Sequence, residues 1–260
     1  MMKTAIIASK KDPAGMNIKE CLEEYDLEKY GAKVFAVEKE SVFNEDIDKS
    51  IEADLFIFAT KHQSREGVPS LSCHVPGNWG KADFGGIERK LCVAPAVYLK
   101  EIFLLLNKIN DLGGFQLTME CTHHGPYLAK PCFFIEIGSS EEQWNNKKAG
   151  KVIAKVIFEF LNKLKNNDLG SYKSAFAVGG THYLSTLNKL QLNSDIAIGH
   201  TCPKYRLRNL DEHMLLQAIQ KTIPKPDFIL LDWKGLGKEK QRIINLLDEL
   251  KIEYKRTDKI

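Results

Sequence analysis

The chain has 260 residues and mixed charge, with 37 lysines and arginines against 34 aspartates and glutamates, so its net charge is only +3. This length allows one or two domains and is ample for a sizeable hydrophobic core. Because the net charge is small, overall charge cannot drive binding to nucleic acid, and any such binding requires a local basic patch.

Cysteine usage and hydropathy favour a cytoplasmic protein with no membrane contact. The six cysteines form no C-x-x-C pair, which argues against a zinc ribbon and for reduced, buried thiols. The first nine residues are too short an apolar run for a signal peptide. The most apolar segment, residues 94–106, is interrupted by Lys100 and Glu101 and is too short to span a bilayer.

Strand-like and helix-like patterns alternate along the whole chain. Apolar runs bounded by polar residues, glycine or proline predict strands at 4–8, 34–37, 55–59, 115–121, 132–137, 175–178, 196–198 and 228–231. Apolar periodicity predicts helices at 16–30, 95–110, 140–164, 211–221 and 236–250. A capping box of Ser139 and Glu142 opens the third helix. This alternation predicts a single α/β domain over residues 1–260.

Residues 66–87 form the least regular stretch, which contains proline, glycine and tryptophan. Long irregular segments inside compact domains are usually functional or disordered. The aromatic and apolar content of this one argues against disorder. We therefore expect a structured loop that brings His74 to a site.

The most informative stretch is 118–126, where Glu120, Cys121, His123 and His124 follow an apolar run and precede a Gly-Pro pair. In open α/β sheets, ligands bind beyond the carboxyl ends of strands, and this stretch ends a predicted strand. If strand alternation persists, Glu120 and His124 share a face and form the natural chemical pair, unless the chain bends before the glycine. The alternative is a purely structural strand end with hydrogen-bonded histidines.

Five histidines directly follow predicted strands, His74 lies in the irregular loop, and His213 is expected on the surface of a helix. The five are His62, His123, His124, His182 and His200. Because several strand ends meet at one edge of a sheet, we expect these side chains to come together, although each alone fits a structural role. Imidazoles with a carboxylate are typical of a Zn²⁺ site that keeps an open position for water. The spacing does not match H-E-x-x-H.

Glycines and cations flank these histidines. Gly179 and Gly180 precede His182, where they allow close approach of the backbone to a ligand. No nucleotide-binding fingerprint of the G-x-G-x-x-G or P-loop type is present. Cations that suit a polyanionic substrate lie near His62 and His200, with an aromatic that could stack on a base. They are Lys61, Arg65, Lys204, Arg206 and Arg208, with Tyr205 among them.

Three segments carry a resemblance to a known family: Glu120 to Pro126 (E-C-T-H-H-G-P), His74 to Asn78 (H-V-P-G-N) and Gly179 to Tyr183 (G-G-T-H-Y). Together they resemble the archaeal and plant-type D-aminoacyl-tRNA deacylases, the zinc-dependent D-tyrosyl-tRNA deacylase family. The family most often has alanine where Cys121 stands. The resemblance implies a three-layer α/β/α fold around a mixed, mostly parallel sheet, which is phosphorylase/hydrolase-like and similar to peptidyl-tRNA hydrolases and zinc exopeptidases.

The resemblance further implies hydrolysis of the ester between a D-amino acid and tRNA, with Zn²⁺ as cofactor and tRNA as partner. The site residues expected on this basis fall into four groups. They are Glu120, His124, His74 and His62 for catalysis; His123, His124, His182 and Glu120 for metal; Lys61, Arg65, Lys204, Tyr205, Arg206 and Arg208 for tRNA; and Gly179, Gly180, Thr181 and His200 for the substrate pocket. A zinc peptidase or amidase and a non-catalytic RNA-binding module remain as alternatives. Monomer and homodimer both stay open.

Overall fold

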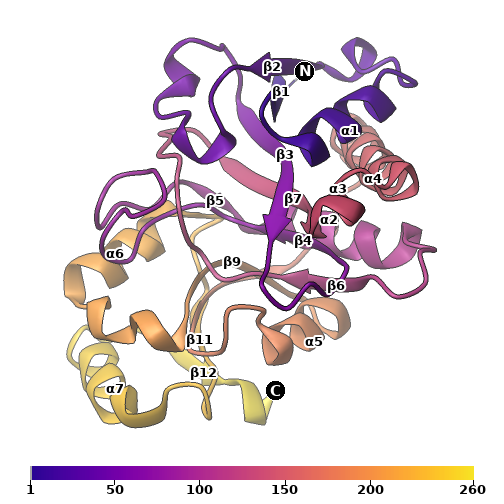
Figure 1. The fold of residues 1–260 in the computed structure, drawn as a ribbon. Coiled ribbons are helices and arrows are strands. Elements are labelled where there is room, and N and C mark those ends of the chain that lie inside the picture. The colour runs from indigo at the N-terminus through magenta and orange to yellow at the C-terminus, as the bar shows by residue number, and fades with distance from the viewer. Residues whose placement is uncertain (1) are drawn as a thin grey trace.

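The computed structural model describes residues 2–260 and contains two main β-sheets with helices around them (Figure 1). The larger sheet has six strands in the order β2-β1-β3-β7-β4-β6. Strand β4 runs antiparallel to β7, and the other neighbouring pairs are parallel. The α/β class with a mixed, mostly parallel sheet is therefore confirmed. The strands are β1 (Thr4–Ser9), β2 (Ala32–Val37), β3 (Leu55–Gln63), β4 (Ser70–His74), β6 (Gln116–Met119) and β7 (Cys132–Ser139).

A second sheet of four parallel strands, in the order β12-β11-β8-β9, is built from the C-terminal part of the chain. A two-stranded ladder of β5 (Ala94–Pro95) and β10 (Thr222–Ile223) connects the two parts. Sequence patterns did not separate the two sheets, because strands and helices alternate in the same way in both. The strands are β8 (Lys173–Val178), β9 (Ile196–Cys202), β11 (Phe228–Leu231) and β12 (Tyr254–Arg256).

Helices gather on one side of the six-stranded sheet, where α1, α2 and α4 pack on one another and on the strands (Figure 1). Helix α2 also packs against β9, so it links the two sheets. The helices are α1 (Pro13–Leu22), α2 (Ala96–Ile109), α3 (Glu141–Trp144), α4 (Lys147–Lys165), α5 (Ser185–Asn193), α6 (Glu212–Lys221) and α7 (Lys240–Glu249). Within residues 2–260, no helix combines the length and the apolar character needed to cross a membrane.

Local sequence explains where several helices start. Asp12 accepts a hydrogen bond from Gly15 N at 2.9 Å, and Pro13 occupies the first turn of α1, where its missing N–H costs nothing. Asn146 and Asp211 cap α4 and α6 in the same way. Short polar side chains satisfy the free N–H groups of a first turn, and this fixes these boundaries.

One hydrophobic core extends through both sheets. It contains Ile57 and Ile135 of the larger sheet together with Ala175, Ile198 and Leu230 of the smaller one. The two sheets therefore share buried side chains, and the single domain over residues 1–260 stays a prediction.

All eight predicted strands are present, but other expectations were wrong. The helix expected over 140–164 is two helices, because Asn145 and Asn146 interrupt it, and the capping box uses Ser140 and Gln143 one position later. The helix expected over 16–30 ends at Leu22. Strand β4 and helix α5 were not predicted. His74 therefore ends a buried strand rather than lying in an irregular loop.

Candidate active site

The predicted cluster exists, but it lies on a face of the six-stranded sheet rather than at its carboxyl edge. Thr60 of β3 pairs with Glu136 of β7, and Glu136 pairs with Ser72 of β4. Paired residues of adjacent strands point to the same side, so this row, together with His62 and His74 two residues further along their strands, faces away from the α1–α4 layer. Strand alternation therefore sets the site, because β3 extends further than the sequence indicated and β4 is a strand that was not predicted.

Gly138 makes room for His62. The two residues are partners in the β3–β7 ladder, and a Cβ at position 138 would lie 2.9 Å from His62 Cδ2. No real Cβ tolerates that distance, so any larger residue at position 138 would displace the imidazole. Trp144 holds the same histidine from outside by donating to its carbonyl oxygen at 2.8 Å.

Glu120 follows β6 and connects the two sheets. Its carboxylate Oε2 accepts from His182 Nε2 at 2.9 Å, and Oε1 lies 3.2 Å from His62 Nδ1. The backbone N–H of Cys121 donates to the carbonyl oxygen of His182 at 2.9 Å, which fixes the loop after β8 beside β6. Burial alone would raise the pKa of Glu120, but the hydrogen bond from His182 and the nearby imidazoles outweigh it and lower that pKa to about 2.

His182 is the cationic member of the cluster. Burial lowers its pKa, but its contacts with Cys121 and Glu120 outweigh this and raise the pKa to about 10. Its ring is therefore protonated at neutral pH, paired with the ionised Glu120. Its Nδ1 lies 3.5 Å from Cys121 Sγ and 3.3 Å from the Tyr205 hydroxyl.

Glu136 is a second buried carboxylate, which sequence reasoning missed. Thr60 Oγ1 donates to it at 2.7 Å and Ser72 Oγ at 3.4 Å, while His62 Nδ1 and His74 Nε2 lie 3.6 and 3.7 Å away. Burial raises its pKa, but the attraction of the two nearby imidazoles outweighs this and holds the pKa well below the usual range. The sequence does contain a signal for it, since Glu136 is the one charged residue inside the apolar run 132–137. A carboxylate buried in this way requires polar partners.

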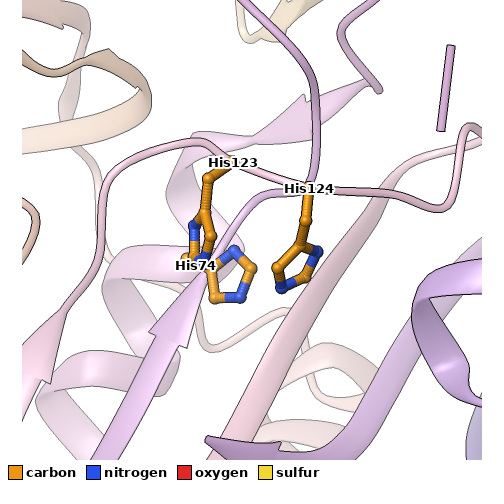
Figure 2. A group of neighbouring side chains, drawn as sticks. All are labelled: His74, His123 and His124. Carbon is orange, nitrogen blue, oxygen red and sulfur yellow. The ribbon is translucent and has the colours of Figure 1, made fainter. Parts of the chain in front are cut away.

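His74, His123 and His124 converge on one point (Figure 2). Their ring centroids lie 4.3 to 4.8 Å apart. His124 has a φ of +41°, so the chain bends before Gly125 and places His123 and His124 together instead of on opposite faces. The expected pairing of Glu120 with His124 was therefore wrong, and Glu120 contacts His182 and His62 instead.

Neutral imidazoles dominate this trio. Burial, reinforced by the neighbouring imidazoles, places the pKa of His123 well below its usual value and lowers that of His124 to about 4. His123 Nδ1 lies 2.8 Å from the carbonyl oxygen of Cys121, and His124 Nδ1 lies 2.6 Å from that of Gly125. A neutral ring donates its one N–H to these acceptors, which leaves Nε2 with a free lone pair.

Several buried polar atoms of the cluster have no hydrogen-bond partner within residues 2–260. They are Nδ1 and Nε2 of His74 and Oε1 of Glu120. Such atoms are costly unless something binds them. Three groups, two of which share His123, could each hold a metal ion, because the donor atoms within each group lie within 4.8 Å of one another. The groups are His74, His123 and His124; Cys121, His123 and His182; and His62, Glu120 and Glu136.

The cluster opens to solvent at His123 and His182, whose side chains are 23% and 30% exposed, while His74 and Glu120 are fully enclosed. Two tyrosines border the opening. The Tyr183 hydroxyl lies 3.1 Å from His62 Nε2, and the Tyr205 hydroxyl reaches Cys121 Sγ at 3.3 Å although Tyr205 is 56% exposed. A ligand approaching the cluster from this side would meet His182 and Tyr205 first.

His200 is not part of the cluster. It lies inside β9 and is fully buried, with Nε2 2.9 Å from the carbonyl oxygen of Cys92 and Nδ1 3.1 Å from Thr122 Oγ1. Burial lowers its pKa to about 3, so the ring is neutral. Both ring nitrogens are occupied within the fold, which argues against the predicted role in the substrate pocket. His213 is exposed on α6, as expected.

The other predicted residues surround the site. Lys61 lies in β3 and, with His124 and Glu136, lines a cavity of about 80 Å³, whereas Arg65 is exposed beyond that strand. A short 3₁₀ turn, Lys204–Asn209, carries the basic cluster Lys204, Arg206 and Arg208 next to His182. Gly179, Gly180 and Thr181 link β8 to His182, and both glycines have positive φ.

Imidazoles and carboxylates gathered on one face of a mixed α/β sheet define a centre of the type that hydrolytic enzymes use to activate water. A family model described as D-aminoacyl-tRNA deacylase matches residues 49–255. The D-aminoacyl-tRNA deacylase of Thermococcus kodakarensis is 35% identical over 96% of this chain and 98% of that protein. The chain therefore belongs to the D-aminoacyl-tRNA deacylase family.

Two further comparisons agree. The D-aminoacyl-tRNA deacylase of Methanococcus maripaludis is 34% identical over 98% of this chain and 100% of that protein. The crystal structure of a conserved protein of unknown function superposes with a TM-score of 0.89, covering 100% of this chain and 96% of that one at 27% identity. The fold and the family expected from the three sequence segments are thus confirmed.

Proposed function

We propose that this chain hydrolyses the ester bond between a D-amino acid and the terminal ribose of tRNA, and so removes D-amino acids from misacylated tRNA. Family membership supports the reaction. One observation at the site supports the assignment of this reaction to specific residues. His74 has both ring nitrogens buried without a partner, beside two neutral imidazoles and an ionised carboxylate.

A zinc ion fits this environment, because neutral imidazoles and carboxylates are the ligands that Zn²⁺ prefers. His74, His123 and His124 would hold it, and they would satisfy the unpaired nitrogens of His74. His62, Glu120 and Glu136 form a second candidate set. His74 joins the predicted ligands His123 and His124 in this set, while the predicted ligand His182 belongs to a third candidate set with Cys121 and His123. Bound there, Zn²⁺ would polarise the ester carbonyl and lower the pKa of a water molecule.

Glu120 and His182 then have complementary roles. Glu120 is ionised, and its Oε1, which lies beside His62 but receives no hydrogen bond within residues 2–260, would accept a proton from the water that attacks the ester carbonyl. His182 is protonated and partly exposed, so it is placed to give a proton to the ribose oxygen when the ester C–O bond breaks. Glu136 orients the imidazoles of His62 and His74 from beneath.

The tRNA phosphates would meet the basic turn beside His182. Lys204 and Arg208 are exposed there, and Arg206 lies over the ring of Tyr205. Lys61 and Arg65 supply cations on the other side of His62. We place this activity in the cytoplasm, where aminoacyl-tRNA is made and used.

Turnover of D-tyrosyl-tRNA and L-tyrosyl-tRNA by the purified protein, together with its metal content, tests the proposal. We expect release of D-tyrosine only, loss of turnover after chelation, and recovery with Zn²⁺. Equal hydrolysis of both substrates would refute D-specific deacylation. Full activity in chelated protein with no bound metal would refute the zinc assignment.

A further inference from the structure

The second sheet contains a topological switch point that the catalytic cluster does not use. Strands β8 and β11 are neighbours, but the chain continues from β8 to β9 on one side and from β11 to β12 on the other. The loops at the carboxyl ends of β8 and β11 therefore diverge. In open parallel α/β sheets, this is the position of the ligand-binding crevice.

A cavity of about 440 Å³ lies at that position. Its walls come from the segments that follow all four strands: Gly180 and Thr181 after β8, Lys204 after β9, Asp232 to Gly235 after β11, and Thr257 with Asp258 after β12. This volume is in the range of pockets that hold small ligands. Residues Ser185 and Thr186, at the start of α5, complete the lining.

Two glycines keep the crevice narrow at its base. A Cβ at Gly235 would lie 2.2 Å from the backbone nitrogen of Gly180, so the loops after β8 and β11 touch directly. Gly180 has a φ of +84°, a conformation that side chains disfavour. Trp233 forms a wall, with the guanidinium of Arg256 3.8 Å from its ring centroid.

The charges of the crevice suit a nucleotide. Lys204 and Lys234 are exposed and have no carboxylate within 4.0 Å among residues 2–260. Asp258 is already paired with Arg256 at 2.7 Å, and Asp232 is held by Gly235 N at 3.1 Å. Two free ammonium groups can therefore meet a phosphate, and the second oxygen of Asp232 can accept from a hydroxyl or an exocyclic amine.

The crevice adjoins the catalytic cluster through two short links. Thr181, which lines the crevice, precedes His182, whose Nε2 contacts Glu120. Lys204 precedes Tyr205, whose hydroxyl lies 3.3 Å from His182 Nδ1. The ester of an aminoacyl-tRNA joins the amino acid to the ribose of the terminal adenosine. When the ester carbonyl lies at the catalytic cluster, the terminal nucleotide therefore lies near Thr181 and Lys204, which line the crevice.

We propose that the crevice between β8 and β11 binds the 3′-terminal adenosine nucleotide of the tRNA, with Lys204 and Lys234 at its phosphate and Asp232 at its ribose or base. This rests on the proposed deacylase function, because that function supplies the nucleotide.

Binding of adenosine 5′-monophosphate to the full-length protein, measured by calorimetry, tests the crevice without turnover. In Thr186→Glu, a carboxylate replaces an exposed hydroxyl at the edge of the crevice. A negative charge in the first turn of α5 favours the helix, so the fold should persist. We expect this variant to bind the nucleotide at least 10-fold more weakly and to show a similar rise in KM for D-aminoacyl-tRNA. His213→Glu, in the first turn of α6, is the matched control and should behave as wild type.

A second experiment tests whether the crevice binds the terminal nucleotide of the tRNA substrate rather than a free nucleotide. Uncharged tRNA with its terminal adenosine should inhibit deacylation at least 10-fold more strongly than tRNA that lacks it. Equal inhibition by the two tRNAs, or wild-type binding and KM in Thr186→Glu, would overturn the proposal. If Thr186→Glu does not fold, Lys234→Glu in the exposed loop after β11 provides the same test. A protein that binds the nucleotide but hydrolyses no D-aminoacyl-tRNA would instead refute the proposed function.

Discussion

Replacing Glu120 with glutamine separates its chemical role from its structural one. The side chains have nearly the same shape, so the change removes the negative charge and leaves the packing. If Oε1 takes the proton of the attacking water, kcat should fall about 10²–10⁴-fold, as is typical for loss of a general base. His182 would also lose its anionic partner at 2.9 Å.

The structure further predicts a loss of stability from this change. A tenfold change in proton affinity is worth about 1.4 kcal/mol, so the fall of the Glu120 pKa from 4.5 to about 2 corresponds to about 3 kcal/mol of native stability at neutral pH. Because the folded pKa is the lower one, this contribution is complete above pH 4.5 and is lost as the pH falls from 4.5 towards 2. At about 2–4 °C per kcal/mol for a chain of this size, Glu120→Gln should melt about 6–12 °C below wild type at pH 7.

The assay combines single-turnover deacylation with thermal melts of metal-free protein at neutral and acidic pH. Glu249→Gln, at an exposed position near the end of α7, is the control and should change neither quantity. Wild-type turnover with a wild-type melting temperature would refute both roles of Glu120. A lower melting temperature with normal turnover would leave Glu120 as the partner of His182 only.

Three further outcomes are expected. His74→Ala should bind at least 10-fold less zinc than wild type, measured by elemental analysis, whereas His213→Ala should match wild type. Equal metal content in wild type and both variants would exclude His74 as a ligand. Changing Lys204, Arg206 and Arg208 of the basic turn to alanine should raise KM more than it lowers kcat. It should also reduce the slope of log kcat/KM against log salt concentration by about 2–3, whereas an unchanged slope would place the tRNA elsewhere. Lys100→Met should lower the free energy of unfolding by about 3–5 kcal/mol in urea melts, because the buried ammonium donates to three carbonyl oxygens at 2.6 to 3.0 Å. A loss of stability no larger than the loss caused by Lys155→Met, at an exposed position, would contradict this.

Local sequence determined most of the secondary structure and the family. Apolar runs and capping residues depend on neighbours within a few positions, so the eight predicted strands and the start of α6 could be found without tertiary information. The dense stretch 120–126 likewise indicated a site, because a carboxylate and two imidazoles rarely lie so close in the chain without a shared partner.

Only the tertiary structure decided which side chains meet. Glu136 joins His62 and His74 because β7 lies between β3 and β4, and that strand order does not follow from any local pattern. His200 is excluded because β9 continues four residues further than its apolar run, to Cys202, and buries the ring. The bend at His124 likewise overrides the alternation expected from a strand. Pairing between strands that are remote in the chain sets the face on which each residue points, and here that face contains the chemistry.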